Sequence, residues 1–123
     1  MNSDWIDTSR RMVANPEWKW QKFILVRDLG PISEGRLEWR VVLPDSVQGK
    51  DLVPVLTDDI TIGMVWGMIR RQAKQKFGSN QPKIFFGWLE RLGDVMSLED
   101  PSQAIGELWI EVNSESEELE AKP

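Results

Sequence analysis

The sequence predicts an α+β fold in which one main helix packs on one face of a mixed four- or five-stranded sheet. Three observations carry this prediction. Segments with strand character lie on both sides of a single long amphipathic helix, and turns containing Gly or Pro separate them. Hydrophobic residues make up 41% of the 123 residues, which suits one domain with a real core. The expected order is strand, strand, helix, strand, strand.

Two strands are expected before the helix. Residues 18–29 (WKWQKFILVRDL) are rich in β-branched and aromatic residues, and residues 36–44 (RLEWRVVLP) alternate between apolar and polar side chains. The intervening residues 30–35 (GPISEG) have the composition of a hairpin loop. The second segment is expected to point one set of side chains inward and the other outward. The inward set is Leu37, Trp39, Val41 and Leu43, and the outward set is Glu38 and Arg40.

The main helix is expected to run from an N-cap at Thr61 to about Phe77, with Gly78 at the C′ position. The connection before it, residues 45–59, contains Pro54, which favours an irregular edge segment at LVPVL. A rotation of 100° per residue defines one buried stripe. That stripe contains Ile62, Val65, Ile69 and Ala73, with Trp66 and Phe77 at its margins.

Two further strands are expected after the helix. They are residues 83–89 (KIFFGWL) and residues 107–112 (ELWIEV). In the second of these, alternation turns Leu108 and Ile110 inward and Trp109 outward. Residues 90–106 are interpreted as a loop that contains a short helical turn at SLED.

The chain divides into three parts by composition: an N-terminal extension at 1–17, the domain at 18–112, and a disordered acidic tail at 113–123. The net charge is −5, and the tail contributes −3 of it. An acidic chain is a poor candidate for nucleic-acid binding. No stretch has the length of a membrane span and the N-terminus has no apolar signal region, so we expect a cytoplasmic protein that binds no membrane.

The chain has no Cys, His or Tyr. Thiolate and histidine catalysis are therefore excluded, as are cysteine and histidine metal ligands. We expect no catalysis, no metal, no cofactor and no small-molecule substrate. The alternative is a small carboxylate-dependent enzyme, possibly Mg²⁺-dependent, and its candidate acids are the pairs Asp58–Asp59 and Glu99–Asp100.

In the order of its expected elements and in several short motifs, the chain resembles ubiquitin-like β-grasp domains over roughly residues 20–112. The match at the helix start consists of Asp59, Thr61, Ile62, Val65 and Ile69. Downstream, KIFFGWLERLGDVMSLED is similar to the strand, turn and helical turn of that fold. Its Leu92 and Leu98 keep the spacing of two buried leucines, and ELWIEV takes the place of the last strand.

The resemblance implies a function as well as a fold. The chain ends in EELEAKP and has no terminal Gly-Gly, so it departs from the conjugated and sulfur-carrier members. It has no cysteines for the iron–sulfur members. The resemblance therefore implies a non-catalytic protein–protein interaction module or a small subunit of a larger assembly.

The outer face of the predicted sheet is one candidate contact surface. Trp109 faces outward in the last strand, and either Phe85 or Phe86 must do so in the strand before it. Trp88 follows Gly87, and Arg40 flanks the aromatic side chains. Exposed aromatic residues beside arginine are typical of binding hot spots.

The outer side of the main helix is the other candidate surface. Gly63 and Gly67 lie one turn apart beside Arg70 and Lys74, which suggests a groove for a partner protein or for self-association. The alternative is that these glycines allow close packing on the protein's own sheet or on the 45–59 loop. Met64 and Met68 face away from the core stripe. They form either an adaptable contact surface or a surface covered by the N-terminal segment.

Overall fold

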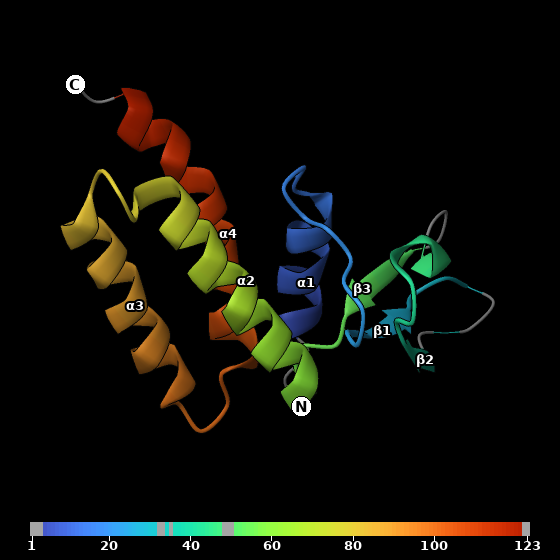
Figure 1. The fold of residues 1–123 in the computed structure, drawn as a ribbon. Coiled ribbons are helices and arrows are strands. Elements are labelled where there is room, and N and C mark those ends of the chain that lie inside the picture. The colour runs from blue at the N-terminus through green and yellow to red at the C-terminus, as the bar shows by residue number, and fades with distance from the viewer. Residues whose placement is uncertain (1–3, 32–33, 35, 48–50, 122–123) are drawn as a thin grey trace.

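The computed structural model describes residues 4–31, 34, 36–47 and 51–121. In Figure 1, three helices lie together at one end of the molecule, a small sheet forms the other end, and α1 lies between them. The described elements in chain order are α1 (Asp4–Ala14), β1 (Leu25–Asp28), β2 (Leu37–Arg40), a 3₁₀ turn η1 (Pro44–Val47), β3 (Leu52–Pro54), α2 (Asp59–Phe77), α3 (Pro82–Met96) and α4 (Ser102–Ala121).

The predicted fold class is wrong. The described residues form four α-helices and a three-stranded antiparallel sheet, so the chain does not form a four- or five-stranded sheet with one main helix. Residues 83–89 and 107–112, both predicted as strands, lie inside α3 and α4. Residues 90–96 are helical as well and are not a loop.

Helical periodicity explains both corrections. In α4 the fully or nearly fully buried side chains follow the i, i+3, i+4, i+7 spacing of one helical face. They are Ile105, Leu108, Trp109 and Val112. In α3 the buried residues Trp88 and Leu92 are one turn apart, and Pro82 occupies the first turn, where its missing N–H costs nothing. Trp109, expected to face outward from a strand, is therefore 0% exposed.

The sheet has the order β2-β1-β3. β1 and β2 form the expected antiparallel pair, with Val26 opposite Trp39, although each strand is only four residues long. β3 is the expected edge segment, and Pro54 lies opposite Val26 at its end. Ser9 of α1 donates its hydroxyl to the Pro54 carbonyl at 3.0 Å, so α1 occupies the β3 side of the sheet.

α2 ends at the predicted Phe77 but begins three residues earlier than expected. Asp58 is the N-cap residue, and its carboxylate accepts the N–H of Thr61 at 2.9 Å. Gly78 caps the other end with a right-handed φ of −56°, so it does not adopt the left-handed C′ conformation. The predicted core stripe is buried, namely Ile62, Val65, Ile69 and Ala73 together with Phe77.

Gly106 lets α4 approach its neighbours closely. α4 packs against α1, α2 and α3. A Cβ atom at Gly106 would lie 2.5 Å from Thr8 Cγ2 and 2.8 Å from Leu56 Cδ1, closer than real Cβ atoms come. The Sδ atom of Met12 would be 3.1 Å away. The glycine therefore sets the distance between α4 and α1.

The predicted N-terminal extension belongs to the folded core. Trp5 and Met12 of α1 are buried, and Trp18 packs edge-to-face on Trp109 with ring centroids 5.5 Å apart. At the other end, α4 continues to Ala121 through the segment expected to be disordered. Asn113 at the start of that segment is buried and donates to Gln72 Oε1 at 3.0 Å.

Parts of some predicted segments lie outside the described residues. These are residues 1–3 of the extension, 32–33 and 35 of the hairpin loop, 48–50 of the long connection, and 122–123 of the tail. In the part of the chain that is described, no helix combines the length and the apolar character required to cross a membrane.

Candidate functional site

Arg40 joins the sheet to the start of α2. Its Nη1 and Nη2 atoms donate to the two carboxylate oxygens of Asp58 at 2.7 and 3.1 Å, and Nη1 also donates to the Phe23 carbonyl at 3.1 Å. The Thr61 hydroxyl donates to Asp58 Oδ2 at 2.9 Å and accepts the N–H of Leu25 at 2.9 Å. This network holds β1 and β2 against the first turn of α2.

The network also sets the charge of Asp58. The hydrogen bond from Arg40 is the largest cause that lowers the pKa of Asp58 to about 2, and the hydrogen bonds from Thr61 act in the same direction against the effect of burial. The same hydrogen bond raises the pKa of Arg40. Arg40 was predicted as a partner contact, yet its two terminal nitrogens are used inside the molecule.

β2 has a free edge on the side away from β1. The Val41 N–H donates to the Ile24 carbonyl at 2.8 Å, so the backbone groups of Val41 and Trp39 face β1 in the alternating ladder. The N–H and C=O groups of Glu38 and Arg40 therefore point away from β1. In the described part of the chain no strand pairs with this edge.

Phe23 has a strained backbone at the end of the same ladder. Its φ is 77°. Its N–H donates to the Val41 carbonyl at 2.8 Å while the Val41 N–H bonds to Ile24, the pattern of a bulge whose first residue is usually glycine. A bulky residue with positive φ costs about 1 kcal/mol or more. Because the Phe23 side chain is 52% exposed, packing inside the protein does not account for it.

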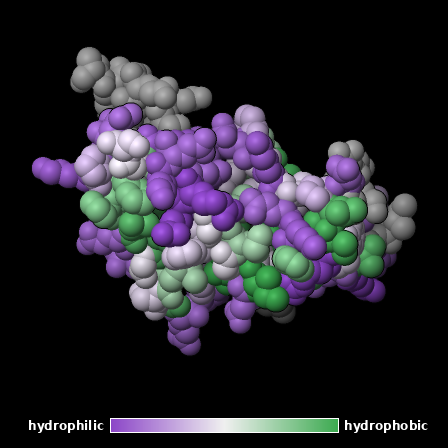
Figure 2. Space-filling model, viewed as in Figure 1, coloured by the Kyte–Doolittle hydropathy of each residue, from purple (hydrophilic) through white to green (hydrophobic). Residues whose placement is uncertain are grey.

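Exposed apolar side chains lie within β2, directly after it, and at the bulge beside Val41. We call the set formed by Phe23, Leu37, Val42 and Leu43 the β2 surface. Leu37 is 52% exposed, Val42 65% and Leu43 64%. Figure 2 shows hydrophobic side chains over the end of the molecule that carries the sheet. Exposed leucines are common singly, but a group of them beside an unpaired strand edge is typical of an interaction site.

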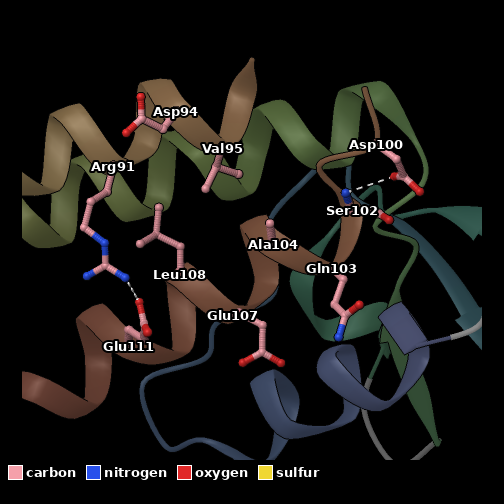
Figure 3. A pocket seen from close by; sticks show the side chains of 10 residues that line it. All are labelled: Arg91, Asp94, Val95, Asp100, Ser102, Gln103, Ala104, Glu107, Leu108 and Glu111. Atoms are coloured by element: carbon pink, nitrogen blue, oxygen red, sulfur yellow. Dashed lines mark hydrogen bonds and ion pairs between the residues drawn. The ribbon is translucent and has the colours of Figure 1, made fainter. Parts of the chain in front are cut away.

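A second feature is an open cleft of about 670 Å³ between α3, α4 and the loop that joins them (Figure 3). Its charged lining consists of Arg91, Asp94, Asp100, Glu107 and Glu111. Arg91 reaches from α3 toward Glu111 on α4 and forms an ion pair with it. Glu107 accepts hydrogen bonds from Arg11 and Thr8 of α1. Glu107 and Glu111 therefore connect helices, and the carboxylates that line the cleft do not converge on one point.

The acidic pairs that the enzyme alternative would use stand at the starts of two different helices. Asp58 caps α2, and Asp100 precedes α4, where it accepts the Ser102 N–H at 3.1 Å. Hydrogen bonds from the Ser102 hydroxyl and backbone lower the pKa of Asp100. Among the described residues no three His, Cys, Asp or Glu side chains are grouped so that they could hold a metal ion.

The predicted aromatic contacts are mostly internal. Trp109 is completely buried, and Trp88 is 4% exposed and stacks on Phe77 with ring centroids 6.3 Å apart. Phe85 is half-buried, while Phe86 is 63% exposed, which decides the choice between these two residues. The expected outer sheet face built around Trp109 therefore does not exist.

The two methionines differ in exposure. Met68 is 3% exposed, and it lines a small cleft with Glu17, Lys19 and Gln21, so the N-terminal segment lies over it. Met64 is half-buried against the core. The predicted methionine contact surface is wrong for Met68, because burial against that segment explains the side chain.

The helix glycines make no close approach. A Cβ atom at Gly63 would meet nothing within 4 Å, and one at Gly67 would meet only the Arg71 side chain, at 3.2 Å. Close packing on the sheet or on the 45–59 loop is therefore not the reason for them. Arg70 and Lys74 are exposed beside them. Their role in binding stays a prediction.

The sequence analysis missed Phe23, Leu37, Val42 and Leu43. Leu37 and Leu43 were assigned to the inner face by alternation. One signal was present, because the apolar run VVL at 41–43 breaks strict alternation and must expose at least one side chain. The positive φ of Phe23 has no sequence signal, since glycine is the residue expected there.

Comparison of the chain with known protein families, with curated proteins and with solved structures found no match.

Proposed function

We propose that the protein is a non-catalytic protein–protein interaction module, or a small subunit of a larger assembly, that binds its partner through the β2 surface. The observation that carries this proposal is the free edge of β2 beside four exposed apolar side chains. An unpaired edge offers main-chain donors and acceptors to an added strand, and the apolar side chains beside it supply buried area.

In the described part of the chain, the edge lacks the devices that usually protect such a strand. Free charges, prolines and covering helices commonly block an exposed edge. Here Glu38 is paired with Arg27 at 2.5 Å and Arg40 with Asp58 at 2.7 Å, so each charged side chain on the edge strand is held in an ion pair within the molecule. The β2 side is therefore open to pairing, whereas α1 packs against β3 on the opposite side.

The strain at Phe23 supports the same surface. A residue that costs folding free energy and leaves its ring exposed is better explained by an external contact than by stability. Large aromatic side chains contribute heavily to binding hot spots.

Site-specific photo-crosslinking tests this proposal. A photoreactive residue is placed at Val42, and in a matched variant at Gln75, an exposed position on α2. In cells that naturally produce the protein, we expect the photoreactive residue at position 42 to give a crosslinked adduct of discrete mass. The adduct should disappear when Leu43→Glu is added. The photoreactive residue at position 75 should give no adduct. Equal adducts from both positions, or none from position 42, would contradict the proposal.

A further inference from the structure

We propose that the partner at the β2 surface is a second copy of this chain, with the two β2 strands paired antiparallel about a twofold axis at Trp39. This inference rests on the proposed function of the β2 surface and names its partner. The result is one six-stranded sheet shared by two chains.

The backbone geometry permits this pairing. The N–H and C=O groups of Glu38 and Arg40 point to the free edge, because the hydrogen bond between Val41 and Ile24 fixes the alternation of the ladder. A twofold axis at Trp39 places Glu38 of one copy opposite Arg40 of the second copy, and Arg40 opposite Glu38. Both pairs are then of the hydrogen-bonded type, so four main-chain hydrogen bonds form across the seam.

Charge selects this register. A shift of the axis to Glu38 places the two Glu38 side chains opposite each other, and a shift to Arg40 does the same for the two arginines. Like charges directly opposite each other are destabilising. An axis midway between two residues would place a residue whose N–H and C=O face the free edge opposite one whose groups face β1. The main-chain hydrogen bonds of the ladder would then be lost. Only the axis at Trp39 brings opposite charges together twice.

The atoms required for these new contacts are available. Arg27 binds Glu38 only through Oε2, with Nε at 2.7 Å, and Oε1 accepts no hydrogen bond from any described residue. Arg40 uses Nη1 and Nη2 for Asp58 and Phe23, and its Nε makes no hydrogen bond within the described part of the chain. Each new pair is thus added to the existing ones without breaking them.

The apolar face of β2 is self-complementary about the same axis. Trp39, which is half-buried in one chain, meets Trp39 of the second copy in a non-hydrogen-bonded pair, where side chains approach most closely. Leu37, 52% exposed in one chain, lies at the end of the seam in register with Val41 of the second copy, whose side chain is already buried in its own chain. The Leu37 side chain therefore lies along the strand of the second copy, and the Trp39 pair is the closest apolar contact across the seam.

The assembly closes at two copies. A twofold interface uses the same surface on both chains, so it leaves only the two β3 edges at the ends of the six-stranded sheet. At β3 the Ser9 hydroxyl donates a hydrogen bond to the Pro54 carbonyl, and α1 packs against the strand. Further strand addition is blocked there.

The first test is a concentration series on the full chain, with the mass from light scattering and amide hydrogen exchange by NMR. We expect the mass to double with concentration. The hydrogen exchange rates of the Glu38 and Arg40 amides should fall about tenfold when about nine-tenths of the chain is dimeric, because these amides exchange only in the remaining monomer. The Trp39 amide, bonded to β1 in each chain, is protected at all concentrations.

Two leucines of equal exposure provide a matched pair of variants. Leu37 is 52% exposed and Leu98, beyond the end of α3, is 50% exposed. We expect Leu37→Lys to shift the chain to monomer and Leu98→Lys to leave the dimer unchanged. Circular dichroism checks that both variants are folded.

A single cysteine tests the register, because the natural chain contains none. Trp39→Cys should form an interchain disulfide on oxidation, since Cα atoms of a non-hydrogen-bonded pair lie ~4.5 Å apart. Leu37→Cys should not, because the two copies of residue 37 lie on opposite sides of the axis. If Trp39→Cys does not fold, the exchange data and the leucine pair decide the question.

The outcomes separate this inference from the proposed function. A monomer at every concentration, with Glu38 and Arg40 exchange independent of concentration, overturns the second-copy proposal. If position 42 still gives its specific adduct in cells, the β2 surface binds a different protein and the proposed function stands. If that adduct is also missing, both fail. A dimer that resists Leu37→Lys and leaves Glu38 and Arg40 unprotected uses another face and also overturns the inference.

Discussion

The helical end and the sheet end of this molecule bury their apolar residues to different extents. α4 packs against α1, α2 and α3, and its Trp109 is 0% exposed. β2 contacts one neighbouring strand, and its Leu37 is 52% exposed. Both ends leave some apolar side chains exposed, among them Phe86 and Leu98 at the helical end. Among the described residues, the sheet end alone also presents a strand edge with unpaired backbone hydrogen-bonding groups.

This difference assigns separate roles to the two ends. The buried face of α4, with Trp109 at its centre, removes a large apolar surface from water and contributes to the stability of the fold. An edge strand with exposed leucines contributes less to stability, so its residues are available for binding. Substitutions at the helical end should therefore change the free energy of unfolding, and substitutions at the β2 surface should change association.

The largest effect is expected at the centre of the helical end. Trp109→Ala removes a completely buried side chain and should lower the free energy of unfolding by about 3–5 kcal/mol. Trp66→Ala is the control, because Trp66 is 37% exposed, and it should cost about 1 kcal/mol. Urea unfolding measures both. Similar losses for the two variants would show that α4 is not the centre of stability.

Two helix glycines should respond with opposite signs. At Gly106 a methyl group would press on Thr8 and Leu56, so Gly106→Ala should destabilise by about 1–2 kcal/mol despite its better helix propensity. At Gly63 the added methyl meets nothing within 4 Å, and Gly63→Ala should stabilise by roughly 1 kcal/mol. Thermal unfolding of the pair tests this. A loss at Gly63 would reveal a close contact with another chain.

The ion pair between the two ends gives a pH dependence. The pKa of Asp58 is lowered to about 2, so its stabilising effect is present above the unfolded pKa near 4 and is lost as the pH falls toward 2. Asp58→Asn should cost about 1 kcal/mol at pH 7, a value reduced because solvent screens a partly exposed pair. The difference from the parent should shrink below pH 4 in urea unfolding. A constant difference at all pH values would assign the loss to the cap geometry alone.

The smallest effect on stability is expected at Phe23. Phe23→Gly relieves the positive φ but makes the unfolded chain more flexible, so the free energy of unfolding should change by less than about 1 kcal/mol. The adduct from position 42 should nevertheless weaken, because the variant removes an exposed ring from the β2 surface. A loss well above that value would show that the ring packs inside the protein.

Local signals were sufficient for part of the fold. The core stripe and C-terminal end of α2 follow from a 3.6-residue period, and the β1–β2 pair follows from alternation around a Gly- and Pro-containing loop. Asp58 was available as a cap beside Thr61, since aspartate is a strong N-cap residue.

The errors came from short apolar segments that satisfy two periods at once. LEWR in β2 and LWIE at 108–111 share Leu, Trp and Glu, but LEWR alternates between apolar and polar residues, whereas LWIE is a short apolar run that fits a strand or a buried helix equally well. The first is a strand and the second is helical. A longer window would have shown Ile105 and Val112 in phase with Leu108 and Trp109, and Pro82 at the start of a helix. Trp109, Trp88 and Met68 were predicted as contact residues from strands and a helix face that were assumed to be exposed. The structure buries all three side chains.

The sequence by itself determined the position and core face of α2, the β1–β2 pairing, and the lack of thiol and imidazole chemistry. Each of these depends on residue type or on a period within one segment. Tertiary structure alone decided how closely α4 packs on its neighbours, because Gly106 lets the helix lie against Thr8 and Leu56, between α1, α2 and α3. It also decided that α1 covers one edge of the sheet and leaves β2 open, since the free edge of a strand depends on what packs beside it.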